Sequence, residues 1–492
     1  MIRTRFAPSP TGYMTIGNLR SALYEFLIAK HAGGTFILRI EDTDQSRYVE
    51  GATDVIYETL KATGLKHDEG PDIGGDYGPY TQSERKSHYM PYAQTLIDKG
   101  HAYPCFCAAR GKFSTDRLED LSNDGSEGSI RDEHNNTKYD RHCLRLDREI
   151  IEQKIRNGEP YAIRQRIQDG STTFHDEVYG DITIDNDEME DQILIKSDGM
   201  PTYNFANVVD DHTMNITHVV RGSEYLTSTP KYTLLYQALG WDIPVYVHLP
   251  LMLNEHGEKI SKRKGDASIT ELMEQGFLPE AIINYIAFLG WNPATQDNEI
   301  YSLSELIKIF EISHISRSPS KFDMVKMSWM NGEHIKRLPP DTFYKMALPT
   351  LQDAIKTPGI DLRVVAAMVQ SRVQFVSECK ALLDFIDVLP DYDINLYTHK
   401  KMKTDAAIAI NALELAMPVL ETLTTWNNDG IYNTLLTCAE KSGLHKSQML
   451  WPIRTALSGK PTSPCGASEL CALLGKDESI KRITVAIGKL TQ

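Results

Sequence analysis

The first 44 residues constrain the fold more than any other part of the chain. Residues 2–6 alternate β-forming side chains with arginine and predict a strand. A loop rich in proline and glycine follows, then an amphipathic helix from about Gly17 to His31 and a second strand over residues 35–40 that ends in an acidic run. Strand, glycine loop, helix and strand open a doubly wound parallel α/β sheet, whose ligands bind beyond the carboxyl ends of its strands.

At 492 residues the chain is too long for one hydrophobic core, so several domains are expected. A polar segment at 114–136 reads as a loop or insertion, and short β-like runs resume near 161–167. From Pro339 onward the pattern is almost wholly helical, with a break near 389–403. The fold class is therefore multidomain α/β plus all-α. The expected division is a split catalytic domain of doubly wound type, an inserted α/β domain, a connecting region and a helical domain in two halves, over residues 1–104 with 193–250, 105–192, 251–338 and 339–492.

Composition narrows the class of protein. No segment has the 18 or more uninterrupted apolar residues of a membrane span, so no membrane partner is expected. Seven scattered cysteines argue against a disulfide framework and favour a reducing, cytoplasmic location. The net charge of −15 argues weakly against a nucleic-acid partner. Contact depends on the local field, however, and basic clusters such as Lys400, Lys401 and Lys403 are present.

Two stretches have the chemistry of phosphate sites. In residues 3–20, a loop with Pro8, Pro10 and Gly12 closes on a helix that begins near Gly17, where free N–H groups and the helix dipole favour an anion. In residues 259–264, KISKRK, lysines bracket a serine between glycines and can surround a polyphosphate. Either stretch alone is as consistent with an ordinary connection or a solvated basic loop.

In this order and roughly 240 residues apart, the two stretches resemble the hallmark motifs of class I aminoacyl-tRNA synthetases. The matching residues are Thr15-Ile16-Gly17-Asn18 and Lys259-Ile260-Ser261-Lys262-Arg263. Further segments over essentially the whole chain resemble bacterial-type glutamyl-tRNA synthetases: RFAPSPTG at 5–12, RIEDTD at 39–44, DGMPTYNFANVVDD at 198–211, THVVRGSEYL at 217–226, LPEAIINYIAFLGW at 278–291, KFDMVKMSWMNG at 321–332 and SPCGASELCALLGK at 463–476. The chain is thus identified as a member of that family.

The resemblance implies the reaction and its partners. L-Glutamate is joined to the 3′ end of tRNA(Glu), with Mg-ATP, through a glutamyl-adenylate and with release of AMP and pyrophosphate. The inserted domain would bind the tRNA acceptor, residues 251–338 would contact the stem, and the helical domain would bind the anticodon. We expect a monomer. Whether tRNA(Gln) is also charged depends on a few anticodon contacts that the sequence does not identify.

The resemblance also assigns site residues. Planar guanidinium groups grip carboxylates, so Arg5 and Arg221 are the candidates for clamping glutamate. Glu41 would accept from the α-ammonium group, and the remaining glutamate contacts would be made by Ser9, Tyr203 and Asn207. The ATP site would comprise Thr15, Ile16, Gly17, Asn18, Glu224, Lys259, Ser261, Lys262 and Arg263. The catalytic contributions would come from Lys262, Lys259, Thr15 and Gly17.

Thr15 departs from the family, which has histidine at the first position of this motif. Threonine donates one hydrogen bond but carries no positive charge, and loss of such a donor typically costs about 2.7–4 kcal/mol. Three interpretations stay open: a variant compensated nearby, a slow enzyme, or a chain repurposed away from catalysis. A tRNA-binding paralogue of weak activity, or another nucleotidyltransferase that shares only the phosphate motifs, are the rival hypotheses.

A cysteine motif suggests a metal. Cys105 and Cys107 form a C-x-C pair, and Tyr139 and Cys143 follow beyond the polar segment, with His142 as an alternative fourth ligand. Some members of the family, and a related tRNA-modifying paralogue, bind zinc with such a pair plus a later cysteine and a tyrosine or histidine. Arg145 stands where some relatives have their histidine. Free structural cysteines are the alternative to zinc.

Overall fold

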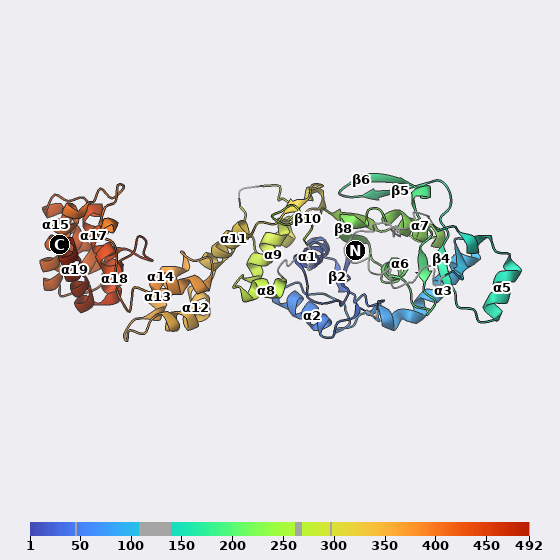
Figure 1. The fold of residues 1–492 in the computed structure, drawn as a ribbon, viewed down its shortest axis with the longest axis horizontal. Coiled ribbons are helices and arrows are strands. Elements are labelled where there is room, and N and C mark those ends of the chain that lie inside the picture. The colour runs from blue at the N-terminus through green and yellow to red at the C-terminus, as the bar shows by residue number, and fades with distance from the viewer. Residues whose placement is uncertain (45–46, 108–138, 261–267, 296–297, 492) are drawn as a thin grey trace. The chain divides into compact units, whose positions relative to one another are not determined.

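A computed structural model describes residues 1–44, 47–107, 139–260, 268–295 and 298–491. The chain divides into two compact units, Met1–Met327 and Ser328–Gln492, and each unit is described by itself. Figure 1 shows the N-terminal unit as mixed strands and helices and the C-terminal unit as helices.

The strands are β1 Arg3–Phe6, β2 Thr35–Leu38, β3 Ala102–Cys105, β4 Ala162–Gln165, β5 Ser171–Asp176, β6 Gly180–Asp185, β7 Ile193–Ile195, β8 His218–Gly222, β9 Val245–Leu249, β10 Met252–Leu253 and β11 Ser320–Lys321. The helices of the first unit are α1 Ile16–His31, α2 Ala52–Ala62, α3 Lys86–Asp98, α5 Arg148–Arg156, α6 Tyr203–Thr213, α7 Thr229–Leu239, α8 Ile269–Glu274, α9 Pro279–Ala287 and α10 Leu303–Ile309. Helix α11, Met324–Arg337, begins at the end of the first unit, and the second contains α12 Pro340–Ala354, α13 Leu362–Gln370, α14 Cys379–Leu383, α15 Ala406–Thr422, α16 Asn428–Lys441, α17 Lys446–Ser458, α18 Ala467–Leu474 and α19 Lys476–Leu490.

The predicted parallel sheet is present at the N-terminus. Strands β1 and β2 are parallel, with Arg3 opposite Thr35, and α1 connects them. Strands β8 and β9 are also parallel, and the Thr217 N–H just before β8 donates to the Arg3 carbonyl at 3.0 Å. The ends of β1 and β8 therefore lie side by side although they are far apart in sequence. This arrangement places residues of both strands in one site.

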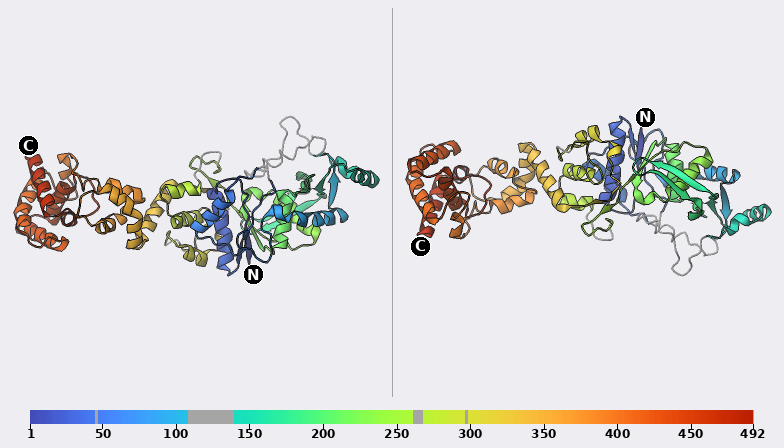
Figure 2. Two further views of the ribbon diagram at one scale, coloured as in Figure 1. Left: turned by 90° about the horizontal axis from the view of Figure 1, so that it is seen from below. Right: turned by 90° about the horizontal axis from the view of Figure 1, so that it is seen from above.

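The remaining strands extend this framework. The β5–β6 hairpin is antiparallel and joins β9 through the pair Asp176 and Tyr246, which gives the order β6-β5-β9-β8. A separate antiparallel sheet has the order β3-β4-β7. Helix α5 lies at one end of the N-terminal unit in every view (Figures 1 and 2).

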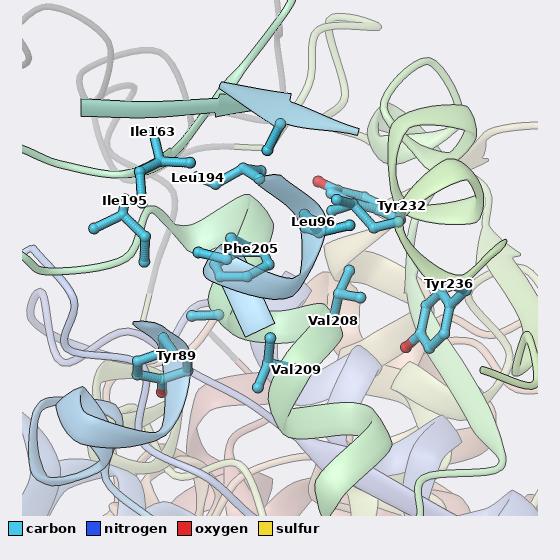
Figure 3. Packing of buried hydrophobic residues seen from close by; sticks show 14 residues of the cluster. Tyr89, Leu96, Ile163, Leu194, Ile195, Phe205, Val208, Val209, Tyr232 and Tyr236 are labelled. Atoms are coloured by element: carbon cyan, nitrogen blue, oxygen red, sulfur yellow. The ribbon is translucent and has the colours of Figure 1, made fainter. Parts of the chain in front are cut away.

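A buried apolar cluster anchors the helices that carry site residues. Phe205 and Val208 of α6 pack with Tyr232 of α7 and with Leu96 of α3, and β7 contributes Leu194 (Figure 3). Burial of aromatic and aliphatic side chains of this size stabilises a fold by about 1.5–3 kcal/mol each. The cluster consequently fixes α6, whose other residues face the polar centre of the unit.

The C-terminal unit is helical, as predicted from the pattern after Pro339. Within this pattern, the run from Arg363 to Ile386 contains two α-helices, α13 and α14, that are separated in sequence. Helix α13 ends at Gln370, and the Glu378 carboxylate accepts from the Gln374 N–H at 2.7 Å, which offers the backbone a partner outside the helix. None of the described helices is long and apolar enough to cross a membrane.

Candidate active site

The start of α1 is the predicted phosphate site. Thr15 is the N-cap of this helix: its hydroxyl oxygen accepts from the Asn18 N–H at 3.2 Å, and the Asn18 side chain accepts from the Thr15 N–H at 3.1 Å. A Cβ built on Gly17 would meet only Met252 Cε and Thr15 Oγ1, both at 3.5 Å, which is ordinary contact. Packing among the described residues therefore does not require glycine here, in keeping with close approach of a ligand.

The two motifs lie beside each other. The Ile269 N–H donates to the Met14 carbonyl at 3.3 Å, and Thr15 forms an isolated antiparallel bridge with Ser268. At the other end of the second motif, Lys259 Nζ lies 3.5 Å from the Glu224 carboxylate. Ser268, which follows the second motif, therefore lies against Thr15 of the first motif. Ser261, Lys262 and Arg263 lie outside the described residues.

A buried ionic cluster surrounds Arg5. Arg5 Nε donates to Asp211 Oδ1 at 2.9 Å, and Arg5 Nη1 lies 3.3 Å from Glu25 Oε1. Arg39 Nη1 reaches the same Asp211 oxygen at 2.8 Å. Burial opposes charge on Asp211, but Arg5 and Arg39 hold the pKa of its carboxyl below the usual value. No described residue accepts from Arg5 Nη2, so one edge of this guanidinium is available to a ligand.

Glu41 belongs to this cluster. Its Oε1 accepts from Arg39 Nη2 at 3.0 Å. Burial raises the pKa of Glu41 to about 7, although Arg39 and Arg5 pull in the opposite direction. The carboxyl thus sits near the midpoint of its titration at neutral pH, so a cation placed against it would increase its charge.

A second group of buried polar side chains lies behind Glu41, and the sequence did not reveal it. Asp210 is fully buried and accepts from Arg85 Nε at 2.7 Å, from Gln82 Nε2 at 2.9 Å and from the Tyr89 hydroxyl at 3.0 Å. Gln82 Nε2 also lies 3.4 Å from Glu41 Oε1. The sequence signal that could have revealed this group is the adjacent pair Asp210 and Asp211 near the end of α6, because charged residues are rarely buried without partners.

Arg221 of β8 has different surroundings. Its side chain is buried and contacts no carboxylate among the described residues. Arg221 Nε donates to His248 Nε2 at 3.2 Å, and Nη2 donates to Thr229 Oγ1 at 2.9 Å. The rings of Tyr225 and Tyr232 lie 5.2 and 4.6 Å from its guanidinium carbon. Aromatic faces and neutral acceptors stabilise the cation without cancelling its charge.

The other predicted glutamate contacts lie on neighbouring elements. Tyr203 begins α6 with its ring 5.9 Å from the Tyr225 ring, and Asn207, one turn later, is buried and donates to the Tyr203 carbonyl at 2.7 Å. Ser9 is half-buried in the loop after β1.

The predicted zinc ligands come together. The Sγ atoms of Cys105, Cys107 and Cys143 all lie within 4.8 Å of one another. The Tyr139 hydroxyl lies 3.2 Å from Cys105 Sγ and 3.9 Å from Cys107 Sγ. His142, the alternative ligand, is exposed. Three thiols and a phenol oxygen in one cluster fit the donor set of a tetrahedral zinc ion.

Comparisons with known proteins identify the family of the chain. Residues 1–329 match the family model of class I tRNA synthetases (E and Q), catalytic domain, and residues 342–487 match an anticodon binding domain. The chain belongs to this family of class I tRNA synthetases.

Several proteins similar to this chain are named as glutamate–tRNA ligases. A glutamate–tRNA ligase of Clostridium acetobutylicum is 54% identical over 490 residues, covering 99% of each chain. A glutamate–tRNA ligase of Lachnoclostridium phytofermentans is 52% identical over 100% of this chain and 99% of its own. The crystal structure of a glutamate tRNA ligase from Elizabethkingia meningosepticum, in complex with its amino acid, is 32% identical and matches 99% of both chains with a TM-score of 0.81.

Proposed function

We propose that this chain is a glutamate–tRNA ligase, which uses ATP to join L-glutamate to the 3′ end of tRNA(Glu). The observation that carries the proposal is a pair of buried arginines, Arg5 and Arg221, each with a guanidinium nitrogen that no described residue engages. A substrate with two carboxylates suits such a pair, because guanidinium groups bind carboxylates in a planar, charge-assisted manner.

The other groups orient the amino acid. Glu41 accepts from the α-ammonium group, which lowers the pKa of the carboxyl toward its ordinary range. Tyr203 and Asn207 present polar groups from the first turns of α6, and Ser9 does so from the loop after β1. The Arg5 cluster is held by Asp211 and by the apolar packing beneath α6, so the site exists before the substrate binds.

The reaction needs no protein nucleophile. The α-carboxylate of glutamate attacks the α-phosphorus of ATP in line, pyrophosphate leaves, and the terminal ribose hydroxyl of the tRNA then takes the acyl group from the adenylate. ATP enters as its Mg²⁺ complex, which neutralises phosphate charge. The start of α1, with Gly17 and the loop before it, offers N–H groups to the phosphates. We assign Glu224 to the ribose and Lys259, Ser261, Lys262 and Arg263 to the departing pyrophosphate.

Two further assignments belong to the same proposal. Zinc held by Cys105, Cys107, Tyr139 and Cys143 would crosslink the end of β3 to residues 139–143 and supplies no step of the reaction. The C-terminal unit reads the tRNA anticodon, and the inserted residues 105–192 and the region 251–338 contact the acceptor and stem. We infer a cytoplasmic monomer, because seven cysteines scattered through a long chain suit a reducing compartment.

Aminoacylation of total bacterial tRNA with labelled glutamate and Mg-ATP tests the function. We expect glutamate to be charged and labelled glutamine not to be. Arg221→Met should raise the KM for glutamate at least tenfold, because a charge-assisted hydrogen bond is worth about 1.5–3 kcal/mol. Arg148→Met, which alters an exposed arginine on α5, is the matched control. Binding of tRNA without charging would overturn the ligase, and charging beyond the tRNA(Glu) fraction would add tRNA(Gln) as a substrate.

A further inference from the structure

A chain of three buried side chains crosses the sheet behind the glutamate site. Asp176 ends β5, His248 lies on β9, and Arg221 lies directly opposite His248 on β8. Asp176 and His248 are fully buried, and Arg221 is 6% exposed. Neither Asp176 nor His248 was singled out in the sequence, because three strands far apart in the chain bring them together.

The hydrogen bonds along this chain have one consistent direction. Asp176 Oδ2 accepts from His248 Nδ1 at 2.7 Å and from the His248 backbone N–H at 3.0 Å. With its proton on Nδ1, the imidazole can only accept at Nε2, and Arg221 Nε donates there at 3.2 Å. The Thr229 hydroxyl oxygen accepts from Arg221 Nη2 at 2.9 Å, and the hydroxyl lies 2.7 Å from the Tyr225 carbonyl and 3.2 Å from His248 Nε2, so its proton goes to one of these two acceptors.

The imidazole stays neutral in this position. Burial lowers the pKa of His248 to about 4; the hydrogen bond to Asp176 opposes this shift, and the nearby Arg221 cation adds to it. Both oxygens of the Asp176 carboxylate have hydrogen-bond donors, since Oδ1 accepts from the Val178 and Tyr179 N–H groups at 3.0 and 2.8 Å.

Arg221 differs from three other buried arginines of the unit in having no carboxylate partner among the described residues. Arg5, Arg39 and Arg85 each contact a carboxylate. A guanidinium paired with an acid has part of its charge offset, whereas a guanidinium held by an imidazole and aromatic rings keeps more of its attraction for an anion. An uncharged amide offers the same shape as a carboxylate but not this charge.

We infer that Asp176 and His248 form a positioning pair that holds Arg221 through a neutral acceptor, so that its charge serves the side-chain carboxylate of the substrate and sets the preference for glutamate over glutamine. The inference rests on the proposed function, in which Arg221 clamps glutamate. It makes Asp176 a specificity-determining residue that never touches the substrate.

Asp176→Asn is the sharpest test. The amide oxygen can keep the two N–H donors at Val178 and Tyr179, but its NH₂ group then faces His248 and drives the proton from Nδ1 to Nε2. Arg221 Nε–H then faces the N–H at His248 Nε2 and loses its acceptor. We expect the KM for glutamate to rise about tenfold or more, the KM for ATP to stay within twofold, and the preference for glutamate over glutamine to fall. Asp181→Asn, which breaks the exposed His175–Asp181 contact on the same hairpin, should change none of these.

A second pair of variants separates positioning from packing. His248→Gln places an amide oxygen where it can accept from Arg221 and should stay within about threefold of wild type, whereas His248→Leu should behave like Asp176→Asn. Long-range ¹⁵N–¹H correlation spectra of the wild-type protein, with the His248 signal identified by its loss in His248→Gln, should show Nδ1 protonated and Nε2 bare.

The outcomes are distinguishable. If Arg221→Met raises the glutamate KM but Asp176→Asn leaves it unchanged, or raises both KM values equally, the positioning role is wrong and the proposed function stands. A protonated Nε2 in the wild type also overturns the positioning role. If Arg221→Met itself has no effect, the proposed clamp fails first.

Discussion

The Thr15 hydroxyl and Asn18 are hydrogen-bonded to each other at the start of α1. Thr15 Oγ1 accepts from the Asn18 N–H at 3.2 Å and donates to Asn18 Oδ1 at 2.8 Å, so the hydroxyl is engaged in capping the helix. The hydroxyl at the first position of the motif is therefore engaged in capping α1.

The capping role predicts a stability effect. Thr15→Val keeps the shape of the side chain but loses the cap, and should lower the free energy of unfolding of the N-terminal unit by about 1 kcal/mol. Thr15→Ser keeps the hydroxyl and should stay within about 0.5 kcal/mol of the wild type. Urea denaturation followed by tryptophan fluorescence measures both. Equal stability of the two variants would refute the capping role.

Activity tests the three interpretations of Thr15. We expect Thr15→His to change the rate of glutamate-dependent pyrophosphate exchange by less than about tenfold, because the second motif carries Lys259, Lys262, Arg263 and Lys264 and supplies ample positive charge for the phosphates. A gain of a hundredfold or more would instead show that Thr15 makes the natural enzyme slow. Tyr13→His, an exposed change two residues away, controls for an added imidazole.

The sequence was sufficient where chemistry is local. Residues 2–40 carry strand, loop and helix signals in order, and the structure confirms each element within a few residues. Arg5 and Arg221 are both buried, and their assignment as ligand groups stays a prediction. The partners of these arginines were out of reach, because Glu25, Asp211 and His248 meet them only through the packing of α1 and α6 and the register of β8 with β9.

The C-terminal helical unit shows a feature that the sequence pattern does not predict, namely where a helix ends. The run from Arg363 to Ile386 has helical periodicity, but periodicity reports which face is buried and not whether the backbone continues as one helix. Glu378 binds the N–H groups of Gln374 and Phe375, at 2.7 and 3.3 Å, and so stabilises a turn between α13 and α14. Such contacts between a side chain and the backbone are not part of the apolar pattern from which helices are predicted.

The cysteine cluster predicts a zinc content. Purified protein should contain about one zinc per chain, measured by plasma mass spectrometry, because three thiols and a phenol oxygen converge there. Cys143→Ser should lose most of the metal and lower the melting temperature, since metal bound only by the folded state stabilises it. Cys438→Ser, at a buried thiol outside the cluster, should retain the zinc. Metal-free wild-type protein with an unchanged melting temperature would favour free cysteines.

Glu41 predicts a pH dependence of glutamate binding. Its pKa is raised from 4.5 to about 7, mainly by burial, so the carboxyl is largely protonated at pH 6 and largely ionised at pH 8. An ionised Glu41 attracts the α-ammonium group, and calorimetry should therefore show the Kd for glutamate falling as pH rises from 6 to 7.5 and levelling above that. The slope approaches, at most, about tenfold per pH unit. His248 does not titrate in this window because its pKa is about 4.

Stability should respond in the opposite direction. A folded-state pKa above the unfolded value means that the native state retains a proton which the unfolded chain releases, so this contribution favours the fold fully below pH 4.5 and is lost as pH rises through about 7.

Glu41→Gln should abolish the pH dependence of both the glutamate Kd and the free energy of unfolding in this range, and it should weaken glutamate binding at pH 8. Glu69→Gln, whose carboxyl has a pKa held below its usual value by Arg3 and Tyr80 in spite of partial burial, should leave both slopes intact. If Glu41→Gln retains the wild-type slope, another group titrates in the site and Glu41 does not bind the ammonium.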